Sequence, residues 1–246
     1  MTLTRTQGFV ILTASVLASI VFAWPFLFPR MFGEFISGGY LAIAAVFALA
    51  IAVLWVFDKS VISPRQLAVL GVMATLASAT RIATSGVAGF ELVFLIVILS
   101  GFAYGAKFGF FVGALSVAMS SLFFGGLGPW TAFQIFAVGW VGAGAGLVAL
   151  ISVQKKYQIW FLALYAALAS YLFGAVMNLW FWPFAVADST IAYDASAPAS
   201  QNLSSFLLYT LSTSTLGWDS VRAISLAALI LLLGGPLVQV MRRAKV

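Results

Sequence analysis

Eight stretches of the chain are apolar and long enough, or nearly so, to cross a lipid bilayer. A spanning helix needs about 20 mainly apolar residues, and soluble domains carry roughly 25% charged residues, whereas this chain carries only 7%. The sequence therefore predicts an all-α, polytopic membrane helix bundle. The eight expected helices lie at 8–28, 38–57, 66–84, 90–105, 108–124, 130–151, 158–182 and 217–241.

The basic residues predict how these helices are oriented, because loops on the cytoplasmic side are enriched in Lys and Arg. If the N-terminus is cytoplasmic, only Arg30, Arg81 and Arg222 lie near the outer side. The bias predicts a multi-pass membrane protein with both termini cytoplasmic, and we expect its membrane to be the cytoplasmic (inner) membrane of a bacterium. The nine remaining basic residues, all predicted to be cytoplasmic, are Arg5, Lys59, Arg65, Lys107, Lys155, Lys156, Arg242, Arg243 and Lys245.

The reactive side chains of many enzymes are missing from the sequence. It contains no histidine and no cysteine, and its six acidic residues are scattered. A nucleophile needs an adjacent base, and a catalytic metal needs clustered ligands. We therefore expect no catalytic residues, no metal site and no cofactor bound by this chain, and we expect that the protein is not an enzyme.

A glycine-rich turn at residues 125–128 opens the helix expected at 130–151. Pro129 suits the first helical turn, where its missing N–H has no intrahelical partner. Trp130 and Gln134 are four residues apart and share one helix face. They indicate either one wall of a ligand pocket with the glycines as its gate, or a tryptophan at the membrane interface above a packing glutamine.

Four charges are expected at the same outer level as Trp130. Arg81 and Glu91 flank the loop between two helices and could pair across it. Asp219 and Arg222, three residues apart, could form a local ion pair. Ionisable residues in membrane segments are costly and often functional, so the alternative is that all four belong to a pocket.

Further polar and planar groups are expected at the same level. Asn178 and Trp182 are four residues apart, and an aromatic belt explains the tryptophan but not the amide one turn deeper. Residues 204–211, which include Tyr209, could form a short interfacial helix or a lid. This convergence is typical of a ligand pocket. The predicted substrate-binding residues are Arg81, Glu91, Trp130, Gln134, Asn178, Trp182, Tyr209, Asp219 and Arg222.

Small residues recur every fourth position in the third expected helix, at Gly71, Thr75, Ala79 and Ala83. Rows of this kind let helices approach closely in lipid. The row indicates either packing within this protein or docking onto a partner subunit.

Three stretches, taken together with their order along the chain, resemble the substrate-binding S components of energy-coupling factor (ECF) vitamin transporters. They are residues 93–110 with the following Gly113-Ala114-Leu115-Ser116, residues 125–130 with Gln134, and residues 216–223. The resemblance covers roughly residues 66–243, six of the eight expected helices. It implies a two-helix extension over 1–60 and a six-helix substrate-binding domain over 61–246.

The resemblance also implies a function. An S component binds a vitamin in an outward-facing pocket and delivers it by moving within the membrane. It joins an ECF membrane scaffold subunit and two cytoplasmic ATPases, which use the ATP. Such proteins usually carry an Ala-x-x-x-Ala docking row, which occurs strictly only at Ala79 and Ala83 here.

The resemblance ranks cobalamin or a related corrinoid first as ligand, with riboflavin or another small cofactor precursor as alternatives. Two other classes stay open: a stand-alone secondary transporter and a membrane assembly protein. Secondary carriers often contain internal repeats, and the sequence contains no convincing repeat.

Overall fold

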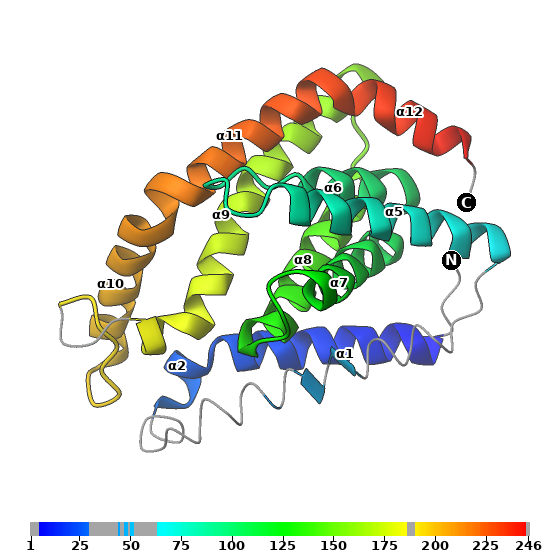
Figure 1. The fold of residues 1–246 in the computed structure, drawn as a ribbon. Helices are drawn as coiled ribbons and strands as arrows, with labels where there is room; N and C mark the ends of the chain where they lie inside the picture. Colours follow the sequence, from blue (N-terminus) through cyan, green and yellow to red (C-terminus); the bar gives the residue numbers. More distant parts are fainter. Residues whose placement is uncertain are drawn as a thin grey trace.

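The computed structural model describes residues 5–29, 44, 47–48, 50–51, 63–185 and 190–244. Within these ranges all regular structure is helical (Figure 1). The predicted all-α membrane bundle is confirmed to this extent, since five helices are long and apolar enough to cross a membrane. The elements are α1 (Arg5–Phe22), α2 (Trp24–Leu27), α5 (Pro64–Ala83), α6 (Val93–Tyr104), α7 (Ala106–Phe123), α8 (Pro129–Val148), η1 (Lys155–Tyr157), α9 (Gln158–Ala185), α10 (Ala199–Thr210), η2 (Leu211–Asp219), α11 (Ser220–Leu229), η3 (Ile230–Gly234) and α12 (Gly235–Arg243).

The centre of the bundle is the short helix α6. Its 12 residues span about 18 Å, and nine of them are buried. It packs with α7 and α8 through glycines: a Cβ at Gly101 or Gly109 would collide with the carbonyl oxygen of Gly142. Small residues at these positions let the three backbones touch, as is common between helices in lipid.

Helix α5 begins where the sequence contains a strong start signal. The Ser63 hydroxyl accepts from the backbone N–H of Gln66, and the Gln66 side chain accepts from the Ser63 N–H. This reciprocal pair satisfies two backbone donors that would otherwise lack partners. Ala74, Ala77 and Ser78 are buried on the inner face of α5, and the Ser78 hydroxyl donates to the Ser116 carbonyl of α7 at 3.1 Å.

The first expected segment is divided in two. Helix α1 ends at Phe22, and α2 begins at Trp24 with Pro25 in its first turn. The proline has no N–H to continue the α1 hydrogen-bond pattern. The second expected segment, 38–57, and the boundary between 60 and 61 lie almost entirely outside the described residues.

The C-terminal part differs from the prediction. A separate helix at 217–241 was expected, with residues 204–211 before it as either a short interfacial helix or a lid. Instead, one helical run extends from Ala199 to Arg243 and contains two π-helical segments, η2 and η3 (Figure 1). The Ser/Thr-rich stretch resembles a loop in sequence, but its hydroxyls bond carbonyls of the preceding turn. Ser212 donates to Leu208 at 2.9 Å, and Thr213 donates to Tyr209 at 2.7 Å.

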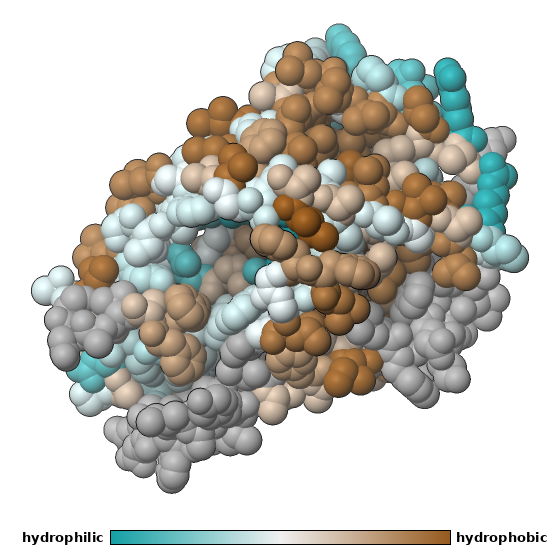
Figure 2. All heavy atoms as spheres, in the orientation of Figure 1, coloured by the Kyte–Doolittle hydropathy of each residue, from teal (hydrophilic) through white to brown (hydrophobic). Residues whose placement is uncertain are grey.

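The two ends of the bundle differ in character. At one end the Tyr104 hydroxyl donates to the Met241 carbonyl at 2.8 Å, which joins the ends of α6 and α12. Arg65, Arg242 and Arg243 lie in the first turn of α5 and the last turn of α12. Figure 2 shows hydrophilic residues gathered where α12 ends and α5 begins, and apolar residues along the flank. The loops that follow α5 and α7 lie at the other end.

Candidate functional site

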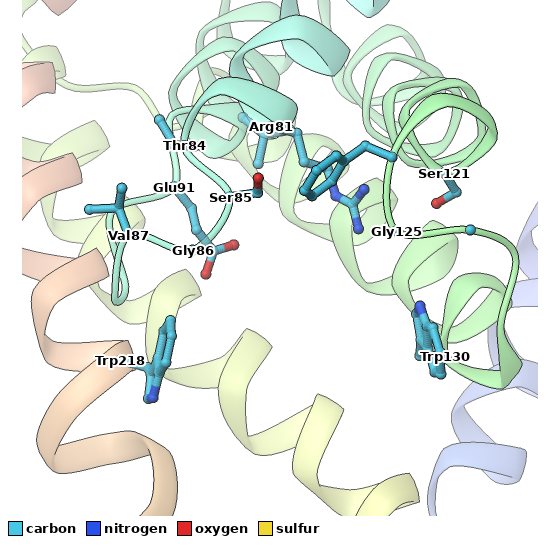
Figure 3. A pocket seen from close by; sticks show the side chains of 13 residues that line it. Arg81, Thr84, Ser85, Gly86, Val87, Glu91, Ser121, Gly125, Trp130 and Trp218 are labelled. Carbon is cyan, nitrogen blue, oxygen red and sulfur yellow. The ribbon is translucent and has the colours of Figure 1, made fainter.

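A cavity of about 220 Å³ lies among these loops (Figure 3). Its walls come from the end of α5, the loop before α6, the loop between α7 and α8, and η2. The charged lining residues are Arg81 and Glu91, and Trp130 and Trp218 face the cavity from opposite sides. Three parts of the chain that are distant in sequence, residues 81–93, 121–130 and Trp218, thus meet around one hollow.

The loops around the cavity need their glycines. Gly125 and Gly126 have φ of 81° and 70° and form part of the wall, and residues other than glycine adopt such angles at a cost. Gly89 has φ of 70°, and a Cβ there would collide with the carbonyl oxygen of Trp218. This close approach positions Trp218 beside the loop that carries Glu91.

Arg81 is held by neutral groups. Its Nη1 donates to the Ser120 hydroxyl at 2.8 Å, and its Nη2 donates to the side-chain amide oxygen Oε1 of Gln134 at 2.7 Å. The predicted pairing of Arg81 with Glu91 was one of two alternatives, and no ion pair joins them among the described residues. Gln134 does not line the cavity; it orients Arg81, which does.

Arg222 is the centre of a buried ion network. Its Nη2 and Nε both donate to Oε1 of Glu91, at 2.6 and 3.1 Å, and its Nη1 donates to Oδ1 of Asp219 at 2.8 Å. The same Nη1 also donates to the Ser170 carbonyl at 3.2 Å. The predicted local pair between Asp219 and Arg222 is confirmed, and its extension to Glu91 was not foreseen.

The network continues to Asn178 through η2. The Ser214 hydroxyl, which is positioned by the π-helical segment, donates to Oδ2 of Asp219 at 2.9 Å and accepts from Nδ2 of Asn178 at 2.8 Å. The amide therefore has the partner that its depth in an apolar helix requires. Asn178 is joined to the site through hydrogen bonds rather than through the cavity wall.

Two predicted site residues lie elsewhere. Trp182 is fully buried, and its Nε1 donates to the Ile191 carbonyl at 2.7 Å. Tyr209 is buried in the same aromatic cluster, with Phe206 and Phe26. Neither lines the cavity. Trp218 was not among the predicted residues, although its position beside Asp219 in one of the resembling stretches was a usable signal.

The row of small residues in α5 points outward. Gly71, Thr75, Ala79 and Ala83 are all exposed, whereas Leu70, Ala74, Ala77 and Ser78 on the other side of the helix are buried. Among the residues that the structure covers, no neighbour lies within 4 Å of a Cβ built on Gly71. We call Gly71, Thr75, Ala79 and Ala83 the outward row.

Comparisons with known proteins supply no relative. No family model, no curated protein and no solved structure matches this chain. Within the described ranges, no group of three or more acidic side chains is positioned to hold a metal ion. The functional proposal therefore rests on the arrangement of the residues around the cavity.

Proposed function

We propose that this protein is the substrate-binding S component of an ECF-type ABC importer for a vitamin or related micronutrient. The observation that carries the proposal is the composition of the cavity. Trp130 with Gly125 and Gly126 belongs to one of the stretches that resemble S components, and Trp218 belongs to another. These two stretches are almost 90 residues apart in sequence, so their meeting at one hollow favours a shared role in ligand binding.

The volume of the cavity bears on the choice of ligand. Pockets for drug-sized molecules measure roughly 300–1,000 Å³, and this cavity measures about 220 Å³. A corrinoid is larger than a drug-sized molecule, so the dimensions favour a smaller cofactor precursor. Riboflavin is near the upper limit and would require the glycine loop at 125–128 to move outward.

The partners and topology follow from the same proposal. The outward row on α5 would contact the membrane scaffold subunit, and two cytoplasmic ATPases would supply the energy. Residues 61–246 would form the six-helix substrate-binding domain, preceded by a two-helix extension over 1–60. The chain would lie in the bacterial cytoplasmic membrane with both termini inside and would itself bind no ATP or metal.

Native mass spectrometry of the protein purified from its own membrane tests this proposal. We expect a copurified small molecule together with the scaffold and ATPase subunits. Trp130→Ala and Trp218→Ala should each lower the bound fraction of that molecule. Trp160→Ala is the matched control, because Trp160 is exposed on α9 and does not line the cavity. Purification without any small ligand or ATPase partner would contradict the proposal.

A stand-alone secondary transporter is a second candidate, and one observation favours it. Secondary carriers often bind substrate at interrupted helices, and the run from α10 to α12 is interrupted by two π-helical segments, the first of which, η2, ends at the buried Asp219. Uptake in cells that lack every ECF ATPase would support this candidate over the first.

A further inference from the structure

The two walls of the cavity carry opposite charge. On one wall, Arg81 makes its two side-chain hydrogen bonds to Ser120 and Gln134, which are neutral. No carboxylate lies within ion-pairing distance of Arg81 in the described part of the chain. The guanidinium therefore brings a positive charge to the lining, and the carboxylate of Glu91 attracts it from beyond ion-pairing distance.

The other wall carries a surplus negative charge. Glu91 and Asp219 share one guanidinium, that of Arg222, so the three groups together have one negative charge in excess. Both bonds from Arg222 to Glu91 end on Oε1, and Oε2 accepts no hydrogen bond from the residues that the structure covers. The Glu91 side chain is 31% exposed, against 1% for Asp219. The surplus is therefore accessible at Glu91.

Flat apolar surfaces flank these charges. Trp130 and Trp218 are 43% and 47% exposed and stand on opposite sides of the cavity (Figure 3). The same view shows the Glu91 carboxylate and the Arg81 guanidinium directed toward the space between them. At about 220 Å³, the cavity is smaller than the pockets for drug-sized molecules, which measure roughly 300–1,000 Å³. It suits a ligand of one aromatic ring with two small substituents.

We propose that the cavity recognises a small aromatic zwitterion. The ring lies between the two indoles, its cationic group faces Oε2 of Glu91, and a carboxylate binds Arg81. The carboxylate can form charge-assisted hydrogen bonds with Arg81, which are about twice as strong as neutral ones, and the cation is attracted by the charge of Glu91 and by the faces of the tryptophans. The inference rests on the proposed function only in taking this cavity as the ligand site, and it adds the chemical class of the ligand.

Four pyridine derivatives of nearly equal size test the charge requirement. They are N-methylnicotinate (a zwitterion), nicotinate (an anion), N-methylnicotinamide (a cation) and nicotinamide (neutral). We expect isothermal titration calorimetry with the full-length purified protein to show N-methylnicotinate binding most tightly. Loss of either charge removes one of these charged contacts and should weaken binding about tenfold or more. Tightest binding of any other member, equal binding of all four, or no binding of any would overturn the inference.

Two substitutions assign each charge to its wall. Glu91→Gln should abolish the preference for the two N-methylated compounds over their unmethylated counterparts. Arg81→Gln should abolish the preference for carboxylates over carboxamides, whereas Arg81→Lys should retain part of it. A uniform loss of affinity for all four compounds would show a merely structural role and contradict the assignment. Arg243→Gln, at the other end of the bundle, is the control and should change neither preference.

The binding and copurification experiments together distinguish the proposed ligand class from the proposed S-component function. A copurified micronutrient and copurified ATPases, combined with no preference for the zwitterion, would reject the ligand class and leave the S-component proposal intact. A preference for the zwitterion without copurified ECF partners would support the ligand class and reject the S-component proposal.

Discussion

Arg222 donates two hydrogen bonds to the same oxygen of Glu91, at 3.1 Å from Nε and 2.6 Å from Nη2. The two residues are 131 positions apart, and the contact ties helix α11 to the loop that enters the central helix α6. The guanidinium also lies 5.4 Å from the ring of Phe94 and 5.0 Å from that of Phe173. Aromatic faces attract a guanidinium, so Arg222 is held from several sides.

Arg222→Met should strongly destabilise the protein. Removing one partner of a buried ion pair costs about 3–5 kcal/mol, because the remaining charge is left unpaired, and here two carboxylates are left. Arg222→Lys keeps the charge but not the planar guanidinium group. Its midpoint of thermal unfolding in detergent should therefore lie between that of Arg222→Met and that of the wild type. Arg243→Met, at an exposed helix end, is the matched control. Equal midpoints for Arg222→Met and the control would show that the network contributes nothing to stability.

Gly174→Ala tests the close approach of α9 to η2. A Cβ on Gly174 would collide with the Asp219 carboxylate, and inserting atoms into a packed site costs about 1–3 kcal/mol. We expect a lower midpoint of thermal unfolding. Gly71→Ala is the control, since a Cβ there meets no described atom within 4 Å. It should be neutral or stabilising by up to about 1 kcal/mol from helix propensity; the opposite order of the two variants would refute the predicted collision.

The sequence was sufficient to predict most of the helices, and the reason is physical. Apolar length is a local property, so a helix was expected at 66–84 on that ground alone. Helix α5 begins slightly earlier, at Pro64, because Ser63 and Gln66 form a capping pair there. The continuous run from Ala199 to Arg243 was missed, because serine and threonine favour loops in water. In an apolar helix the same hydroxyls bond the preceding turn, as Thr213 does.

The site was predicted in part. Charge positions alone identified Arg81, Glu91, Asp219 and Arg222 as neighbours, but not which of them pair. Pairing depends on side-chain directions set by helix rotation, which a single sequence does not contain. Trp182 shows the same limit. Tryptophans at the membrane interface, in the core and in a ligand pocket occur in similar local sequence patterns, and it is the packing of distant elements that buries Trp182 in the core.

Trp182→Phe should separate the core tryptophan from those of the cavity. The substitution keeps an aromatic ring but removes the Nε1–H that donates to the Ile191 carbonyl. The free energy of unfolding should fall by about 0.5–1.5 kcal/mol, the usual net contribution of one hydrogen bond. Affinity for a cavity ligand should stay at the wild-type value, whereas Trp218→Ala should lower it. Loss of affinity in Trp182→Phe, measured by calorimetry, would contradict the assignment of Trp182 to the core.

The loop between α9 and α10 should lose stability in acid. The Asp194 carboxylate accepts from the Ser196 hydroxyl at 2.6 Å and from the Ser196 backbone N–H at 2.8 Å. These bonds, the hydroxyl first, hold the pKa of Asp194 below its ordinary value of 3.8. A lowered pKa means that the folded state favours the ionised form. Its contribution is therefore complete above the ordinary pKa and is lost as the pH falls through the lower, folded-state value.

Asp194→Asn provides the measurement, because its side chain does not titrate. The thermal midpoint of the wild type should exceed that of the variant by a constant amount above about pH 5, and the difference should shrink below about pH 4. Ser196→Ala removes the hydroxyl, which is the larger cause of the shift, so its acid-dependent loss of stability should be smaller than in the wild type and should be complete at a higher pH. A difference between wild type and Asp194→Asn that persists unchanged at about pH 3 would show that the bonds from Ser196 do not depend on the charge of Asp194.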